Sequence, residues 1–332
     1  EGLTDKHDSA ILHGPPGSLS TIAVEGENVS GEFGAGAVIT NLKDPVMNSS
    51  GTVIFAATIE TDSGTERAIY RSTGSGKTVA VRTHVNYAGM PGNAGSYFDS
   101  IMTDLMINQA GDILFRNYIE DGPEGIPTAE DCGLWLFSNN TITQITRNGA
   151  PAGDLASLTI LNPAARSFAG EYVTFQSRLS GDVTSTNDDC LWIWHQGTLS
   201  LVMREGEEAT VSNGTETGTF QGAGAALSVA ENGVAVLSAR LSNSDAGIWR
   251  WDGQLTHIAS AGGPVPGVEG HSWNSFQTIA INPRGTILFD ASHREGSGPT
   301  TQGIWAVNSV GQLERIFVEG DSIIPNGGEA IQ

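Results

Sequence analysis

Six side chains of this sequence are of the types that could act on an acidic polysaccharide. They occupy corresponding places after apolar stretches along the chain: Arg116, Tyr118, Arg178, Arg240, His293 and Arg294. In an elimination, a guanidinium neutralises the uronate carboxylate while a tyrosine or histidine removes and returns a proton. In this hypothesis Tyr118, His293, Arg178 and Arg240 would be catalytic in a polysaccharide lyase, or all six would form the binding site of a lectin.

The alternative is that these side chains pair with acids on the protein surface, and the composition favours it. The chain of 332 residues carries 37 acidic and 16 basic side chains, a formal charge of −21. Such a surface repels nucleic acid and anionic membranes. No apolar run approaches the roughly 18 residues of a membrane-spanning helix. We therefore expect neither nucleic acid nor membrane insertion.

Acidic stretches between apolar segments could offer oxygen ligands to Ca²⁺. They are Glu60–Glu66, Glu120–Asp131, Asp182–Asp189 and Asn243–Asp245. None has the ligand spacing of a known calcium loop, and the histidines contain no H-x-H or H-x-x-x-H pair. We expect no cofactor, with Ca²⁺ in these stretches as the alternative.

A recurring element must position these side chains. An Asn-x-x-Gly turn leads into an apolar strand, and a Gly-x-Trp motif follows one strand later. Asn is suited to cap a tight turn, Gly to adopt positive φ, and Trp to fill a core. The residues assigned these structural roles are Asn48, Gly51, Asn108, Gly111, Gly170, Gly233, Asn282, Gly285, Trp135, Trp192, Trp249 and Trp305.

Each copy of the repeat predicts four short strands, and consecutive copies predict an all-β chain with almost no helix. Four-stranded units that repeat five times are typical of a β-propeller. We expect it to be five- or six-bladed and to form one domain over residues 1–332. We expect a half-blade at 9–26, blades at about 36–82, 98–146, 158–203, 220–259 and 276–318, and a tail at 319–332.

The half-blade predicts open strand edges, and open edges invite pairing with another chain. The leading hypothesis is therefore a non-enzymatic structural or interaction protein that self-assembles into a filament or surface layer. The tail Ser322–Gln332 or a neighbour's strand would complete the half-blade. The alternative is a lyase or lectin for acidic glycans, so a surface or extracellular polysaccharide is the other expected partner.

The repeat units resemble a family of secreted bacterial tandem-repeat proteins named for an Asn-x-x-Gly-x-x-Ala-Phe repeat. The resemblance covers residues 9–326, and the chain departs from the repeat at Ser167 and Ala230. It implies a propeller-like fold without implying an activity.

Two cysteines cannot form a disulfide framework. Cys132 and Cys190 lie in neighbouring copies at positions offset by one residue, so we expect free, partly buried thiols. The chain begins at Glu1 without a methionine, and with the acidic composition this favours a processed, secreted or cell-surface protein.

Overall fold

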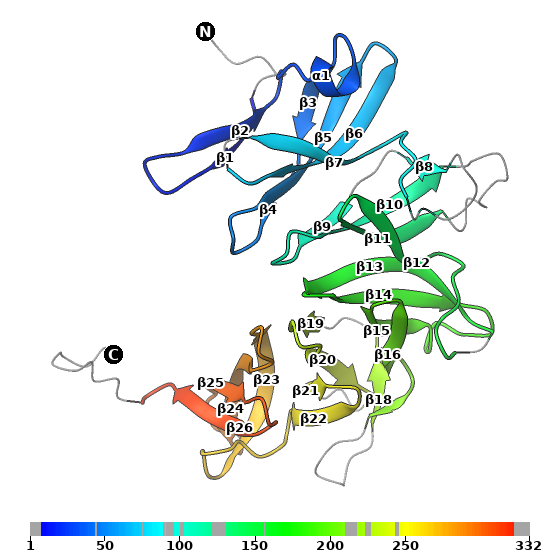
Figure 1. The fold of residues 1–332 in the computed structure, drawn as a ribbon. Coiled ribbons are helices and arrows are strands. Elements are labelled where there is room, and N and C mark those ends of the chain that lie inside the picture. Colours follow the sequence, from blue (N-terminus) through cyan, green and yellow to red (C-terminus); the bar gives the residue numbers. More distant parts are fainter. Residues whose placement is uncertain are drawn as a thin grey trace. The chain divides into compact units, whose positions relative to one another are not determined.

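A computed structural model describes residues 8–43, 45–74, 76–88, 90, 96–99, 103–120, 131–155, 157–209, 218–222, 227–242 and 246–321. The chain divides into two compact units, Glu1–Phe168 and Ala169–Gln332. Nearly all of the regular structure is β, and the described helix is the single turn α1 (Ser30–Phe33) (Figure 1). Within the described residues, no helix is long and apolar enough to cross a membrane.

The first unit begins with a two-stranded antiparallel sheet and continues with two larger sheets. The first sheet pairs β1 with β2, the second has the order β3-β5-β6-β7, and the third has the order β12-β11-β10-β8; β4 pairs with β5 and β9 with β10. The strands are β1 (Ala10–His13), β2 (Ser20–Val24), β3 (Val38–Leu42), β4 (Val46–Met47), β5 (Val53–Thr61), β6 (Gly64–Ser72), β7 (Lys77–Arg82), β8 (Tyr97–Phe98), β9 (Thr103–Ile107), β10 (Ile113–Glu120), β11 (Cys132–Ser138), β12 (Thr141–Arg147) and β13 (Thr159–Ala169), which runs to the division.

The second unit repeats the same antiparallel pattern three times. Its strands pair in the orders β14-β15-β16, β17-β18-β20-β21-β22 with β19 beside β20, and β23-β24-β25-β26. They are β14 (Tyr172–Ser180), β15 (Asp189–His195), β16 (Thr198–Arg204), β17 (Glu208–Ala209), β18 (Gly218–Gln221), β19 (Leu227–Val229), β20 (Ala235–Leu241), β21 (Ala246–Trp251), β22 (Leu255–Ser260), β23 (His271–Ile281), β24 (Ile287–Glu295), β25 (Thr301–Val307) and β26 (Leu313–Val318).

The Asn-x-x-Gly turns have the predicted chemistry. Asn48 Oδ1 accepts the amide of Thr52 at 2.9 Å, and Asn108 and Asn282 accept the corresponding amides of their own turns. The turn glycines adopt left-handed φ, with 82° at Gly51, a conformation that is costly for other residues. These three asparagines therefore cap their own turns, as the repeat pattern predicts.

One of these asparagines, Asn48, also joins its repeat to the next. The side-chain amide of Asn48 donates to the carbonyl of Asn108, the first residue of the next turn, at 2.9 Å. In the second unit, Asn232, the third residue of its turn, donates to the carbonyl of Arg284, the third residue of the next turn, at 3.2 Å. Asn48 is buried, so the bond satisfies a polar group that would otherwise lack a partner. The Asn48 side chain thus caps its own turn and links that turn to the turn of the next repeat.

The Gly-x-Trp motif is a packing requirement. Gly303 and Trp305 point to the same face of β25, and a methyl group added to Gly303 would lie 2.4 Å from the Trp305 ring. The corresponding distance from Gly247 to Trp249 is 2.5 Å. Trp305 and Trp249 are buried. Glycine is therefore needed because the indole folds back over it.

The core consists of apolar layers between successive sheets. Ile54, Ile69 and Val81 of the β3–β7 sheet pack against the β8–β12 sheet. In the second unit, the layer between the β17–β22 and β23–β26 sheets places Val236 and Ile248 against Trp273, Phe289 and Trp305. The sheets therefore stack through their faces, with the Trp face of one against the preceding sheet.

The all-β propeller prediction is confirmed: blade-type sheets occur at each predicted copy, preceded by a two-stranded half-blade. Because the two units are described separately, a single domain over the whole chain stays a prediction. The tail Ser322–Gln332 lies outside the described residues.

Candidate functional site

Two of the six predicted site residues meet on β10 in the first unit. Arg116 Nε donates to Cys132 Sγ at 3.3 Å, and Tyr118 is the cross-strand neighbour of Cys132. The electrostatic interaction with Cys132, together with partial burial, raises the pKa of Tyr118. A raised pKa disfavours the phenolate that a lyase base requires. Arg116 and Tyr118 thus surround a thiol.

The arginines of the second unit lie on different strands. Arg178 on β14 forms an ion pair with Asp189 at 3.8 Å, with its side chain 62 % exposed. Arg240 on β20 is exposed and lies across from Gln221. Arg294 on β24 is exposed and lies across from Ser272. Arg178 therefore has the ion pair expected of a surface arginine.

His293 is buried on β24 beside a second histidine. Its Nδ1 lies 2.8 Å from Nδ1 of His271, and its ring contacts Trp305 edge-on at 5.5 Å. Burial, together with the charges of His271 and Arg315, lowers the pKa of His293. The imidazole is therefore held neutral inside the sheet, and its Nε2 is buried without a hydrogen-bond partner. This setting is structural packing, and the adjacent Arg294 is exposed, whereas His293 is buried.

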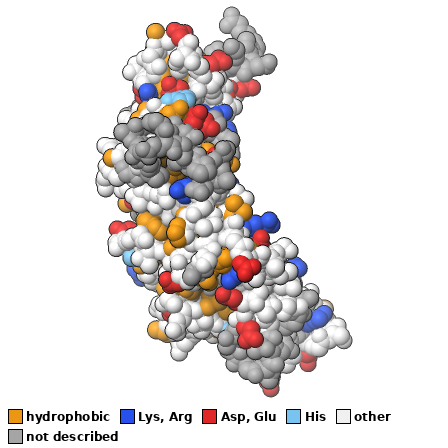
Figure 2. Space-filling view, turned by 90° about the vertical axis from the view of Figure 1, so that its right-hand side faces the viewer, with side chains coloured by type: hydrophobic (Ala, Val, Ile, Leu, Met, Phe, Trp, Pro, Cys, Tyr) orange, Lys and Arg blue, Asp and Glu red, His pale blue; other side chains and the backbone are white. Residues whose placement is uncertain are grey.

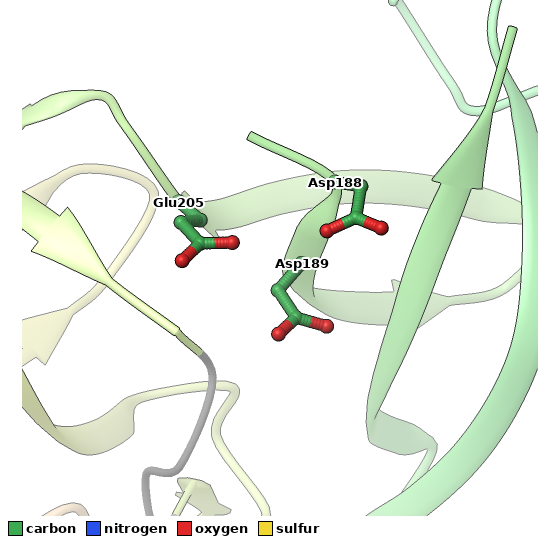
Figure 3. Close-up of side chains that lie close together, drawn as sticks. All are labelled: Asp188, Asp189 and Glu205. Carbon is green, nitrogen blue, oxygen red and sulfur yellow. The ribbon is translucent and has the colours of Figure 1, made fainter. Parts of the chain in front are cut away.

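Three carboxylates of the second unit come together where a metal could find oxygen ligands. Oxygen atoms of Asp188, Asp189 and Glu205 lie within 4.8 Å of one another. Figure 3 shows Glu205 on one side and the two aspartates on the other. Asp189 already pairs with Arg178, and Glu205 accepts the amide of Gly222 at 3.1 Å. Ca²⁺ binding in Asp182–Asp189 therefore stays a prediction; residues 121–130 and 243–245 of two other acidic stretches lie outside the described residues.

The more developed site is a groove within the second unit that the sequence patterns did not indicate. It has a volume of about 370 Å³ and lies between the β14–β16 strands and the β20–β21 strands. Its lining comprises Tyr172, Ile193, His195, Thr198, Ser200, Asn232, Gly233, Val234, Trp251, Asp252 and Gly253. Aromatic faces and hydroxyl, amide and carboxylate groups therefore share one concave surface.

Two stacked rings form one wall of this groove. The rings of Tyr172 and His195 lie 4.0 Å apart and within 8° of parallel. His195 Nε2 lies 3.6 Å from the carboxylate of Glu171, which also accepts the side-chain amide of Gln196. A methyl group on Gly233 would come within 2.6 Å of the Tyr172 ring. The next repeat's turn therefore leaves room for the tyrosine only because it carries glycine.

The opposite wall comes from the following repeat. Trp251 ends β21 and is half-buried, packed against the apolar layer below it. Asp252 follows it and forms an ion pair with Arg250. Asn232 is held by its bond to Arg284, and its Oδ1 accepts the amide of Val234 at 3.2 Å. The polar groups on this side are thus fixed by their own bonds.

A family model matches residues 1–329. The chain belongs to DUF7453, a family of unknown function. No curated protein gives a match to this DUF7453 sequence. The resemblance to the Asn-x-x-Gly-x-x-Ala-Phe repeat family stays an expectation.

Solved structures with a similar fold share little sequence with this DUF7453 chain. A protein of unknown function from Dyadobacter fermentans has 14 % identity and a TM-score of 0.32 over 87 % of this chain and 88 % of that chain. The Aleuria aurantia lectin, a six-bladed β-propeller with a fucose recognition mode, has 10 % identity and a TM-score of 0.30 over 86 % of this chain and 95 % of the lectin chain. A Hadza microbial sialidase has 14 % identity and a TM-score of 0.31 over 81 % of this chain and 56 % of the sialidase chain. At these scores the likenesses carry no argument about the activity of the DUF7453 chain.

A second groove lies in the first unit of the DUF7453 chain, with a volume of about 510 Å³. It is lined by Gly26, Gly36, Val38, Ile39, Thr40, Glu60, Thr61 and Asp62, so its described lining offers carboxylates but no aromatic or cationic side chain. On the face drawn in Figure 2, acidic, basic and hydrophobic side chains are interspersed. The groove of the second unit, called the aromatic groove from here on, is therefore the better candidate for a binding site.

None of the six predicted residues lines either groove. A signal for the aromatic groove was nevertheless present in the sequence. In the third and fourth copies a second tryptophan follows the motif tryptophan by two positions, as Trp194 and Trp251. The other copies have Ser72, Phe137 and Val307 there. The groove lies between the two copies that carry the additional indole.

Proposed function

We propose that this protein binds a neutral saccharide in the groove between the β14–β16 and β20–β21 strands. The observation that carries the proposal is the placement of the Tyr172–His195 stack and Trp251 in one groove with hydroxyl and amide groups. Sugar rings present an apolar C–H face and a rim of hydroxyls. Ligand sites are typically concave, largely apolar and furnished with a few fixed polar groups. The groove supplies both.

The charges around the groove favour a neutral sugar over a uronic acid. Asp252 lines the groove, and the nearby Arg250 is engaged in an ion pair with it. His195 faces Glu171, and the whole chain carries a formal charge of −21. A uronate entering the groove would approach the carboxylate of Asp252, and the described lining contains no arginine or lysine to pair with the uronate. A neutral saccharide is therefore the ligand that we propose.

Calorimetric titration with methyl glycosides of neutral hexoses and deoxyhexoses, alongside glucuronate and galacturonate, tests this proposal. We expect saturable binding of at least one neutral glycoside and no binding of the uronates. Thr198→Val removes a hydroxyl from the groove rim, and Thr256→Val, at an exposed position of β22 outside the lining, is its matched control. Absence of binding across the neutral panel, with the protein folded, would contradict the proposal.

The lyase alternative has its own test. Incubation with uronic-acid polysaccharides would generate unsaturated products that absorb in the ultraviolet. Because Arg116 and Tyr118 are engaged with Cys132, and His293 is buried against His271, we expect no such absorbance.

Self-association is a second candidate, favoured by the N-terminal half-blade. Among the described residues, β1 pairs only with β2, so one edge of β1 is open to another chain. Leu12 and Leu19 in this segment are 52 % and 57 % exposed. Action outside the cell, as a secreted or surface protein, also stays a prediction.

A further inference from the structure

Two histidines of the last sheet lie within hydrogen-bond distance of each other. Nδ1 of His271, the first residue of β23, lies 2.8 Å from Nδ1 of His293 on β24. The antiparallel register of the two strands brings them together across 22 positions of the sequence. Packing against Trp305 accounts for the burial of His293, whereas the approach of the second imidazole is a polar contact. The histidine spacings of the sequence could not indicate this pair because its members come from different strands.

A carboxylate lies on the same side of the sheet as the two imidazoles. Glu295 is directly across from His271, and Trp273 is directly across from His293. Cross-strand partners and alternate residues of a strand share a face, so all four side chains project to one side. A methyl group on Gly270 would lie 3.7 Å from Glu295 Oε1, so the carboxylate lies beside the chain next to His271. Two nitrogen ligands and an oxygen ligand thus occur together.

Contacts within the β23–β26 sheet hold the pair in place. The ring of His293 is buried and meets the fully buried indole of Trp305 edge-on at 5.5 Å. The ring of His271 lies 4.8 Å from that of His293 and is inclined to it by 63°. His271 itself is half-buried at the beginning of its strand. The separation of the two nitrogens is therefore set by one sheet of the second unit.

The distance between the two nitrogens suits particular metal ions. Two imidazole nitrogens 2.8 Å apart, each bonded to one ion at about 2.0 Å, would subtend about 90° at that ion. A tetrahedral zinc ion would need the nitrogens about 3.3 Å apart at the same bond length. Right angles between imidazole ligands are typical of tetragonal Cu²⁺ and Ni²⁺. The geometry of the pair therefore favours these two ions over Zn²⁺.

The charge state of His293 also suits a metal ligand. Burial, followed by the charges of His271 and Arg315, lowers the pKa of His293, and the neutral imidazole is the form that binds metal. Arg315 is engaged with the carboxylate of Asp321 and the carbonyl of Gly267. Among the described residues, Nε2 of His293 has no hydrogen-bond partner, so no bond fixes which ring nitrogen carries the proton. Nδ1 can therefore present its lone pair to an ion.

We propose that His271 and His293 chelate a divalent transition-metal ion, Ni²⁺ or Cu²⁺, through their Nδ1 atoms. Water or the carboxylate of Glu295 completes the coordination. Without the ion, the two nitrogens share one proton in a hydrogen bond, and the ion takes the place of that proton. The bound ion joins β23 to β24 and stabilises the folded chain. This site shares no residue with the saccharide groove and is independent of it.

Calorimetric titration of Ni²⁺ into the chelator-treated chain tests the proposal with His271→Asn and His293→Asn. Ni²⁺ is the probe because it does not oxidise the thiols of Cys132 and Cys190. We expect the unmodified chain to show one saturable site that both variants lose. His84→Asn removes an exposed imidazole of the first unit and is the matched control, which should keep the site. Excess Ca²⁺, which prefers oxygen ligands, should not displace the Ni²⁺.

Two further measurements separate chelation by the pair from other binding. Thermal melting should show that Ni²⁺ raises the Tm of the unmodified chain and of His84→Asn but not that of His271→Asn. The electron paramagnetic resonance spectrum with one equivalent of Cu²⁺ should show nitrogen coupling from two imidazoles in the unmodified chain and from at most one in His271→Asn. His271 is half-buried, so this variant keeps the test decisive if His293→Asn fails to fold, as circular dichroism would show.

Ni²⁺ binding of equal stoichiometry and affinity in the unmodified chain and in a folded His271→Asn variant would overturn the proposal. Absence of Ni²⁺ binding by the unmodified chain would overturn it as well, and would leave the pair as a hydrogen bond.

Discussion

The rings of Tyr172 and His195 are stacked 4.0 Å apart, across from each other on β14 and β15. Cross-strand pairs at such distances stabilise a sheet. Here the pair also forms a flat wall of the groove, opposite the following repeat's Trp251 and Asp252. Local sheet pairing thus supplies the surface on which saccharide binding is proposed.

Replacing Gly303 by alanine should destabilise the last sheet. The added methyl group would lie 2.4 Å from the ring of Trp305, which is fully buried and cannot move without opening the core. Overpacking of this kind costs about 1–3 kcal/mol. Thermal melting should show a lower Tm for Gly303→Ala. Gly76→Ala, where nothing lies within 4 Å of the added carbon, should melt like the unmodified chain.

Asn48→Ala should weaken both its own turn and the link to the next repeat. The substitution leaves the amide of Thr52 and the carbonyl of Asn108 without their side-chain partner. The carbonyl of Asn108 still accepts the amide of Gly111, but the buried amide of Thr52 loses its acceptor, which costs about 1–3 kcal/mol. Urea unfolding should show a lower midpoint than for Asn41→Ala, an exposed asparagine on β3. Equal midpoints would show that the link contributes nothing.

The Cys190 thiol should make folding sensitive to alkaline pH. Burial raises the pKa of Cys190 from 9.0 to about 12. Above pH 9.0 the unfolded chain loses this proton while the folded chain retains it, so the contribution is present below that pH and is lost as the pH rises. The loss amounts to about 1.4 kcal/mol per pH unit within this window. Denaturant titrations above pH 9.0 should show a shallower decline for Cys190→Ala.

Thiol labelling checks the same burial independently. Both cysteines are free and buried, so a thiol reagent should modify the folded protein slowly and the unfolded protein rapidly at both positions. Rapid labelling of the native protein would contradict the burial of these thiols.

The sequence could predict the repeat because its determinants are local. Asn282 and Gly285 specify a turn within four residues. Gly303 and Trp305 are two residues apart, so they share one face of the strand and the indole covers the glycine. The groove depends on residues from two successive repeats, Tyr172 and Trp251, whose approach is set by sheet stacking. Strand patterns do not contain that information. For the same reason, correspondence between strand ends did not establish that Arg178, Arg240 and His293 share a site.

The most direct test of the central claim is calorimetric titration of the best neutral glycoside into the unmodified chain and Trp251→Ala. Trp194→Phe, in the neighbouring repeat, is the control because its buried indole does not line the groove. We predict saturable binding by the unmodified chain and the control. Affinity should fall at least about tenfold in Trp251→Ala, equivalent to about 1.4 kcal/mol. Equal affinities for the unmodified chain and a folded Trp251→Ala variant would contradict saccharide binding in this groove.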